Sequence, residues 1–222
     1  MIRENGRVSL YLADIRPLYD PVLAKKVYER LGEDRKKKAD LCRKPAARAA
    51  SLAAGFLSWY ALEKAGCPDG RVRYLESGAP EVEGSSQKLF LSLSHSGDYA
   101  VCALSKRPVG VDLQKRQTVK AGLLRLFYTP KQERLFRERY GIGGCGMLEG
   151  EALDAFLREW TVKESYMKMI GTGMKIGFDR ICTDPGKKRV TLAERDGVFA
   201  LFREYKAPEG YFLSVCTPEN PS

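Results

Sequence analysis

Histidine is almost absent from this chain, which has a single one, His95, in 222 residues. Catalytic schemes that need several histidines are therefore excluded, and any Ser–His pair would have to use His95. The cysteines form no CxxC pair, so a zinc site is not expected. The six of them are scattered along the chain, at Cys42, Cys67, Cys102, Cys145, Cys182 and Cys216.

Long apolar runs are also missing. No stretch is long enough to span a bilayer, and the N-terminus lacks the apolar core of a signal peptide. Scattered thiols in a chain without such a signal are typical of a reducing compartment. The sequence therefore predicts a cytoplasmic protein with buried or inert cysteines and no membrane partner.

Acidic residues are fewer than basic ones. The chain has 28 aspartates and glutamates and 38 lysines and arginines, which gives a formal net charge of +10. Such an excess favours anionic partners, namely nucleic acid, an acidic protein, a phosphorylated small molecule or a membrane surface. No RRM, KH or zinc-finger motif is recognisable, so we expect no nucleic-acid partner. A basic nucleic-acid-binding module stays open as an alternative because of the cluster Asp34–Lys38, which is otherwise expected to be a solvated loop or helix end.

The apolar pattern predicts the same layout twice, a long helix followed by several strands. Helices are expected over 22–31, 46–64, 119–127, 131–140 and 151–170. Strands are expected over 8–15, 71–75, 88–94, 99–105, 109–116, 179–183, 188–194, 198–205 and 211–216, with a hairpin turn at Asp196-Gly197. Runs of strands after a helix, without strict βαβ alternation, favour an α+β fold. We predict two lobes, residues 1–108 and 109–222, with a ligand cleft between them.

The second long helix carries Trp160, Glu164 and Lys168 at intervals of four residues, so their side chains share one row on its surface. A carboxylate and an ammonium one turn apart can place a metal ion beside a phosphate. The simpler interpretation is an amphipathic helix with a Glu–Lys pair on its solvated face. The other parts of the chain favour the first interpretation.

The strand expected over 109–116 carries oxygen-bearing side chains on one face. Asp112 and Gln114 point together to that face, while Val109, Val111 and Leu113 point to the other. Such a pair suits Mg²⁺, which takes few protein ligands and keeps waters and substrate phosphates. The alternative is an edge strand with a polar outer face.

Two basic regions suggest anion binding. His95 lies in the polar connection Ser94–Asp98, where it is either a donor to an anion or simply a turn residue. Lys44 and Arg48 lie near the start of the helix over 46–64, where cations oppose the helix dipole. A bound anion would offset that repulsion.

Three blocks follow one another: Ser94-His95-Ser96-Gly97, then Gly110-Val111-Asp112, then Trp160 to Lys168 with Gly171. Together they resemble the 4′-phosphopantetheinyl transferase superfamily, in particular its two-lobed type typified by the surfactin synthetase activator. The resemblance covers about residues 44–173. It implies a pseudo-dimer of two similar α+β lobes, each a long helix packed on a small, mostly antiparallel sheet, with the active site in the cleft between them.

The resemblance also implies a reaction. The 4′-phosphopantetheine group moves from coenzyme A, the substrate, to a serine of an apo acyl or peptidyl carrier protein, and adenosine 3′,5′-bisphosphate is released. It implies Mg²⁺ or Mn²⁺ at Asp112 and Glu164 with Gln114 beside them, and it assigns catalysis to Glu164, Lys168 and Asp112. Coenzyme A binding is assigned to Lys44, Arg48, His95, Lys163 and Lys168.

Three departures from the family pattern bear on this expectation. Gln114 stands where close relatives have an acid, which should weaken divalent-ion affinity. The turn Gly78-Ala79-Pro80 lacks the lysine of many relatives, and a further family acid falls on Gln132 or Glu133. An inactive relative that only binds carrier proteins is therefore a further alternative. The single-chain, two-lobed layout leads us to expect a monomer.

Overall fold

The computed structural model describes residues 2–5, 8–173, 176–193 and 199–219. The helices are α1 (Pro21–Glu29), α2 (Glu33–Asp40), α3 (Pro45–Lys64), α4 (Leu124–Phe127), α5 (Pro130–Tyr140) and α6 (Gly150–Ile170), with 3-10 turns at Arg16–Tyr19, Ala121–Leu123 and Phe178–Arg180. The strands are β1 (Ile2–Asn5), β2 (Val8–Asp14), β3 (Arg71–Tyr74), β4 (Pro80–Glu83), β5 (Phe90–Ser96), β6 (Tyr99–Ser105), β7 (Gly110–Lys115), β8 (Val119–Lys120), β9 (Met147–Leu148), β10 (Ile181–Asp184), β11 (Arg189–Leu192), β12 (Ala200–Glu204) and β13 (Tyr211–Pro218). None of the described helices is both long and apolar enough to cross a membrane.

Two antiparallel sheets form the centre of the molecule. The first has four strands in the order β1-β2-β6-β5, and the second has five in the order β10-β11-β12-β13-β7. The first sheet uses residues up to Ser105 and the second uses residues from Gly110 onward. The pairs β3–β4 and β8–β9 stand outside both sheets. Helices combined with antiparallel sheets make the α+β fold that the sequence predicts.

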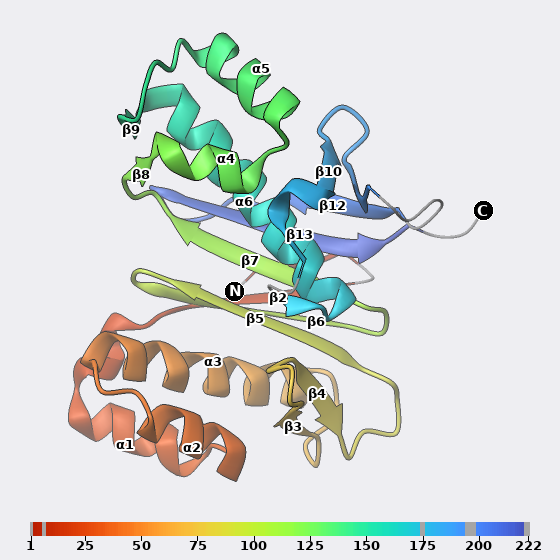
Figure 1. Ribbon diagram of the computed structural model, residues 1–222. Helices are drawn as coiled ribbons and strands as arrows, with labels where there is room; N and C mark the ends of the chain where they lie inside the picture. Colours follow the sequence, from red (N-terminus) through yellow and green to blue (C-terminus); the bar gives the residue numbers. More distant parts are fainter. Residues whose placement is uncertain (1, 6–7, 174–175, 194–198, 220–222) are drawn as a thin grey trace.

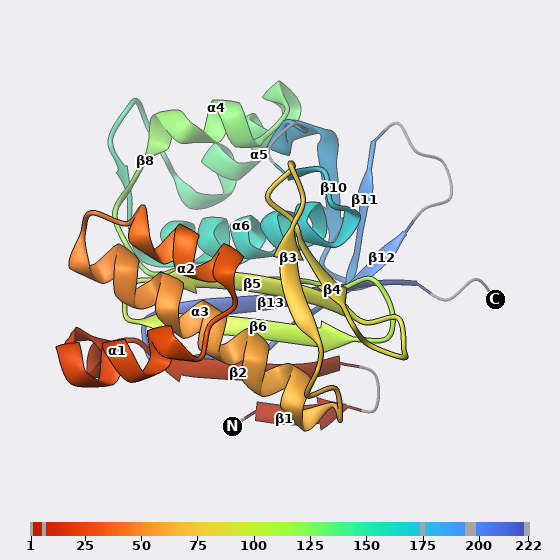
Figure 2. The same ribbon diagram turned by 90° about the horizontal axis from the view of Figure 1, so that it is seen from below.

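The sheets are stacked between two long helices (Figure 1). Helix α3 packs on the first sheet and α6 on the second, and the facing sides of the two sheets share a third core. In that shared core Val101 and Ala103 of β6 lie with Val111 and Leu113 of β7. Seen from below, α1 and α2 lie beside α3 over the first sheet (Figure 2). The unit of a helix on a sheet thus occurs twice.

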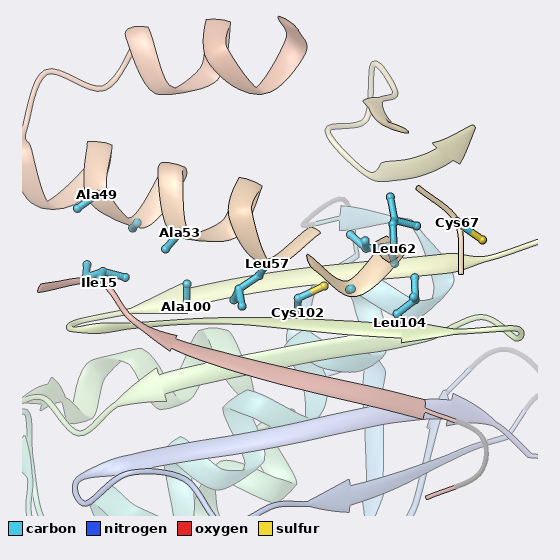
Figure 3. Close-up of a cluster of buried hydrophobic side chains, with 12 residues drawn as sticks. Ile15, Ala49, Ala53, Leu57, Leu62, Cys67, Ala100, Cys102 and Leu104 are labelled. Atoms are coloured by element: carbon cyan, nitrogen blue, oxygen red, sulfur yellow. The ribbon is translucent and has the colours of Figure 1, made fainter. Parts of the chain in front are cut away.

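Small side chains let α3 lie close to its sheet. Pro45 stands at the first turn, where a missing N–H costs nothing. Ala49, Ala53 and Leu57 follow at helical spacing and belong to one buried cluster with Ala100 and Cys102 of β6 (Figure 3). Alternate residues of β6 therefore face α3 and the second sheet, which explains why this strand is buried on both sides.

Helix α6 is held by aromatic packing at its first half and by the second sheet at its second half. Trp160 stacks on Phe127 of α4 with ring centroids 5.5 Å apart, and Phe178 lies 4.7 Å from Trp160. Further along, Tyr166 and Met167 are buried against the sheet. Two such anchors fix the rotation of α6 and hence the direction of its polar row.

Most predicted elements are confirmed, including the helices over 46–64, 131–140 and 151–170. The helix predicted over 119–127 is wrong in its first part, because Val119 and Lys120 pair with β9 and only residues 124–127 are α-helical. Local periodicity does not reveal a pairing with such a distant partner. The cluster Asp34–Lys38, expected in a solvated loop or at a helix end, lies within α2 and reaches its last turn at Lys37 and Lys38. The hairpin predicted at Asp196-Gly197 lies outside the described residues.

Candidate active site

Asp112 lies in the middle of β7, buried between the two sheets and α6. Its Oδ1 accepts a hydrogen bond from Ser94 Oγ of β5 at 2.7 Å and another from Lys168 Nζ of α6 at 2.6 Å. Its Oδ2 is also buried and has no hydrogen-bond partner among the described residues. A buried polar atom without a partner costs about 1–3 kcal/mol, which a bound cation would offset.

Helix α6 brings a second carboxylate to Asp112. Glu164 and Lys168 lie one turn apart on this helix, which ends just beyond them at Gly171 in the left-handed conformation, with φ 72°. Burial raises the pKa of the Glu164 carboxyl, the nearby Asp112 carboxylate raises it further, and Lys168 lowers it. The structure thus brings Asp112, Glu164 and Lys168 together.

Gly110 allows this close approach of strand and helix. A Cβ at this position would lie 1.8 Å from Ser165 O and 2.5 Å from Met169 N, both backbone atoms of α6. Any side chain here would push α6 away from β7. Because Asp112 follows Gly110 on the same face of the strand, the glycine also sets how near the Asp112 carboxylate lies to α6.

The oxygen atoms gathered here fit a hard divalent cation. Asp112 offers one buried oxygen that has no partner among the described residues. The Glu164 carboxyl is close enough for the Asp112 carboxylate to raise its pKa, and Gln114 follows Asp112 on the same face of β7. The described residues contain no group of three or more His, Cys, Asp or Glu side chains placed to hold a metal. Mg²⁺ needs only one or two protein carboxylates when waters and substrate phosphates complete its shell.

Three serines of β5, the serine row Ser92, Ser94 and Ser96, join this strand to β7. Ser92 Oγ accepts from Val111 N at 3.0 Å and Ser96 Oγ accepts from Lys115 N at 2.9 Å. Between these two bonds, Ser94 donates to Asp112. The two sheets are therefore joined at this edge through side chains.

A second charged group, the cation cluster Arg35 and Lys38, lies on α2 in the N-terminal half of the chain, with His95 near Arg35. His95 belongs to β5 rather than to the turn that follows it. Although His95 is exposed, partial desolvation lowers the pKa of its imidazole, and Arg35 and Lys168 lower it further. The positive charges that disfavour protonation of His95 would attract an anion.

Tyr74 of β3 holds both residues of the cation cluster. Arg35 Nη1 donates to Tyr74 Oη at 2.7 Å and Arg35 Nε to Ser51 O at 2.9 Å, while Lys38 Nζ lies 3.2 Å from the centroid of the Tyr74 ring. Burial lowers the pKa of Lys38, and Arg35 lowers it further. Two cations held this close together repel each other, and a bound anion would offset that repulsion.

The two basic residues predicted from the start of α3 are not part of this cluster. Arg48 Nη1 donates to Asp40 Oδ1 at 3.2 Å and to Ala39 O at 3.3 Å, and its guanidinium lies over the Tyr28 ring. Lys44 is exposed at the N-cap of α3. Neither residue is among the charges that shift the pKa of His95.

Lys163 lies on a different side of α6 from its neighbour Glu164. Its side chain is 0% exposed, and Nζ donates to Phe127 O and Phe178 O, each at 3.1 Å. Glu159 lies 3.5 Å away, and burial lowers the pKa of the ammonium. The structure does not bring Lys163 to the acids. It places the Lys163 ammonium in the interior of the C-terminal half.

A groove of about 720 Å³ opens beside Lys168. The hairpin β3–β4, strand β5 and the end of α6 form its walls, so residues of both halves of the chain line it. The turn Gly78-Ala79-Pro80 is part of one wall. This volume is within the range of sites for nucleotide-sized ligands.

Sequence reasoning missed Arg35, Lys38 and Ser94. The two basic residues belong to a charged run without apolar periodicity, and only the fold shows that these two contact Tyr74. Ser94 ends a predicted strand, and the alternation of Ser92, Ser94 and Ser96 is the sequence signal of one polar strand face.

Two further positions have local roles. Gln132 Oε1 accepts from Thr129 N in the capping box of α5 at 3.1 Å, and Glu133 pairs with Arg137. Both side chains thus stabilise α5.

Comparisons with known proteins point to one enzyme family. The sequence profile of the 4′-phosphopantetheinyl transferase superfamily matches residues 108–216, which include Asp112, Glu164 and Lys168. A 4′-phosphopantetheinyl transferase of Bacillus subtilis is 29% identical over 161 residues, covering 71% of this chain and 66% of that protein. The 4′-phosphopantetheinyl transferase gsp of Aneurinibacillus migulanus is 27% identical over 143 residues, covering 64% and 56%. The chain thus spans at most 66% of the length of these relatives.

Among solved structures, a holo-(acyl-carrier-protein) synthase from Bacillus anthracis in complex with CoA (3′,5′-ADP) overlays with a TM-score of 0.36 and 20% identity. The overlay covers 44% of this chain and 92% of that one. The family profile and the curated relatives are what identify the chain. It belongs to the 4′-phosphopantetheinyl transferase superfamily.

Proposed function

We propose that this chain transfers the 4′-phosphopantetheine group from coenzyme A to a serine of an apo acyl or peptidyl carrier protein and releases adenosine 3′,5′-bisphosphate. The names of the curated relatives support this reaction. The observation that carries the proposal is the pair of carboxylates Asp112 and Glu164 beside Lys168, with Asp112 Oδ2 buried and without a partner among the residues that the structure describes. Phosphoryl-type transfer requires positioning and charge neutralisation of this kind.

Coenzyme A would lie across both halves of the chain. Arg35, Lys38 and His95 would hold the 3′-phosphate, and Lys168, which lines the groove and is partly exposed, would reach the pyrophosphate. Lys44 and Arg48 would contribute only to the general positive field, because they lie apart from the cation cluster. Lys163 would stabilise the fold around Glu164 rather than touch coenzyme A.

The residues of the cleft can carry the chemistry. The hydroxyl oxygen of the carrier serine attacks the phosphorus that bears the pantetheine arm, and the bond between that phosphorus and the bridging oxygen breaks. Lys168 would stabilise the negative charge that develops on the leaving adenosine 3′,5′-bisphosphate. Glu164, whose pKa burial raises, would accept the proton of the serine hydroxyl.

A divalent cation, Mg²⁺ or Mn²⁺, would be held by Asp112 and Glu164, with Gln114 as a neutral third ligand or the holder of a bound water. When present, it supplies charge neutralisation for the pyrophosphate.

We further propose a cytoplasmic monomer of two lobes, residues 1–108 and 109–222, with no nucleic-acid or membrane partner. Its net charge of +10 would attract coenzyme A and an acidic carrier protein.

The test is intact-protein mass spectrometry of an apo carrier protein incubated with this chain, coenzyme A and Mg²⁺, beside a sample that contains EDTA. A gain of one phosphopantetheine mass that EDTA abolishes is expected. No gain with several carrier proteins and a range of Mg²⁺ or Mn²⁺ concentrations would contradict the proposal. Binding without transfer would instead indicate the inactive carrier-binding relative.

A further inference from the structure

The bonds of the serine row are not all alike. Ser92 and Ser96 accept hydrogen bonds from the backbone of β7, at Val111 and Lys115, and so join one strand to the other. Ser94 stands between them on the same face of β5, but it donates to the side chain of Asp112. The middle serine thus bonds to a carboxylate that the proposed reaction uses, whereas the outer two accept hydrogen bonds from the backbone.

The bond from Ser94 leaves one oxygen of Asp112 for another partner. Ser94 and Lys168 both donate to Oδ1, and Oδ2 stays buried and unbonded within the described part of the chain. A carboxylate held at one oxygen cannot rotate freely, so the direction of Oδ2 is set by the donors on Oδ1.

The two donors differ in how firmly they are placed. The Lys168 side chain is 28% exposed and lines the groove, so it can leave Asp112 when a phosphate group arrives. Ser94 is 7% exposed and sits inside a strand, so it stays. Once a substrate engages Lys168, Ser94 is the donor that still orients Asp112.

We propose that Ser94 is a positioning residue for the divalent-cation site: by donating to Oδ1 from the first sheet, it fixes Asp112 of the second sheet so that Oδ2 is presented to the cation. This inference rests on the proposed function. It also ties cation affinity to the junction of the two sheets, because the oriented acid and its orienting donor belong to different halves of the chain.

The test measures Mn²⁺ binding to the full chain by isothermal titration calorimetry, with and without adenosine 3′,5′-bisphosphate. Ser94→Ala should weaken Mn²⁺ binding by about 10-fold or more, the usual effect of removing a hydrogen bond to a metal ligand. Ser94→Thr keeps the hydroxyl and should restore most of the affinity. Ser92→Ala is the matched control, since it removes a comparably buried serine hydroxyl from the same strand and should change Mn²⁺ affinity by less than about twofold.

Urea unfolding of the same variants distinguishes positioning from a purely structural role. Both alanine variants should lose similar stability, because each removes one buried hydrogen bond. Equal Mn²⁺ affinity in the wild type and Ser94→Ala would overturn the inference and leave the proposed function standing. Equal weakening in Ser92→Ala and Ser94→Ala would also overturn it. A wild-type chain that neither binds Mn²⁺ nor modifies a carrier protein would overturn the proposed function itself.

Discussion

Each charged residue of the proposed site has a local environment that leaves its charge incompletely compensated. Asp112 is bonded at one oxygen, and its other oxygen has no partner in the described part of the chain. Glu164 is partly desolvated, and the cation cluster is packed around Tyr74. Each of these arrangements costs free energy in the absence of a ligand. The two costs are complementary, since a bound cation would offset the first at the carboxylates and a bound anion would offset the second at the cation cluster.

The cation cluster leads to a prediction that separates two arginines. Arg35→Ala should weaken binding of adenosine 3′,5′-bisphosphate by about 10-fold or more, because a hydrogen bond to a charged group is worth about 1.5–3 kcal/mol. Arg48→Ala should change it by less than about twofold, since Arg48 is engaged with Asp40 and Tyr28. Isothermal titration calorimetry on the folded variants measures both. The reverse order of effects would place the phosphate at the start of α3.

His95 should make stability depend on pH. Its pKa is lowered from the ordinary value of 6.5 in the folded chain, so the unfolded chain binds a proton more readily. The stability that neutral His95 allows is therefore present above pH 6.5 and is lost as pH falls through the lowered folded pKa. Between pH 7 and about pH 5, the wild type should lose more unfolding free energy than His95→Gln in urea titrations. Parallel pH profiles would show that the folded environment does not affect His95.

At the scale of elements, the site depends on how closely α6 approaches β7. Helix α6 reaches the strand at Gly110, and its aromatic anchor to α4 sets which face it presents. Alternate side chains of β7 point toward α6, and side chains one turn apart on α6 point toward β7. Asp112 and Glu164 therefore lie near each other. The closeness of the two elements is thus a condition for the pair of carboxylates.

Gly110→Ala should disrupt this contact. The added Cβ would overlap backbone atoms of Ser165 and Met169, which cannot move aside as a side-chain end can. We expect a loss of about 3 kcal/mol or more in unfolding free energy. Gly122→Ala is the control, because a Cβ there meets nothing within 4 Å and should change stability by less than about 0.5 kcal/mol. Chemical denaturation measures both, and equal stabilities would contradict the close packing of α6 on β7.

Elements with strong local patterns could be predicted from the sequence. The alanine-rich α3, the long α6 and the alternating β7 carry their periodicity within one segment. The short strand β8 could not be predicted, because its partner β9 lies far along the chain.

Residues whose side chains share a row with a recognisable partner could also be predicted, as with Glu164 and Lys168. Arg35 could not, because its neighbours in the charged run are equally basic and only the fold decides which one faces His95. Lys163 shows the opposite case. The sequence places it next to a predicted site residue, but the helix turns its side chain into the interior.

At the scale of the whole molecule, neither half is sufficient for the proposed site. The N-terminal half supplies Arg35, Lys38, His95 and Ser94, and the C-terminal half supplies Asp112, Glu164 and Lys168. The shared core between the sheets and the serine row hold the two sets in register. A substrate with separate phosphate groups can therefore bridge the halves.

The most direct measurement is the initial rate of phosphopantetheine transfer to an apo carrier protein by Glu164→Gln and by the wild type. Loss of this carboxylate should lower the rate at least about 100-fold, equivalent to about 2.7 kcal/mol of the barrier. Glu151→Gln, the same change at an exposed residue in the first turn of the same helix, should stay within about twofold of the wild type. A Glu164→Gln chain that keeps the wild-type rate would show that the transfer does not use the site formed by Asp112 and Glu164.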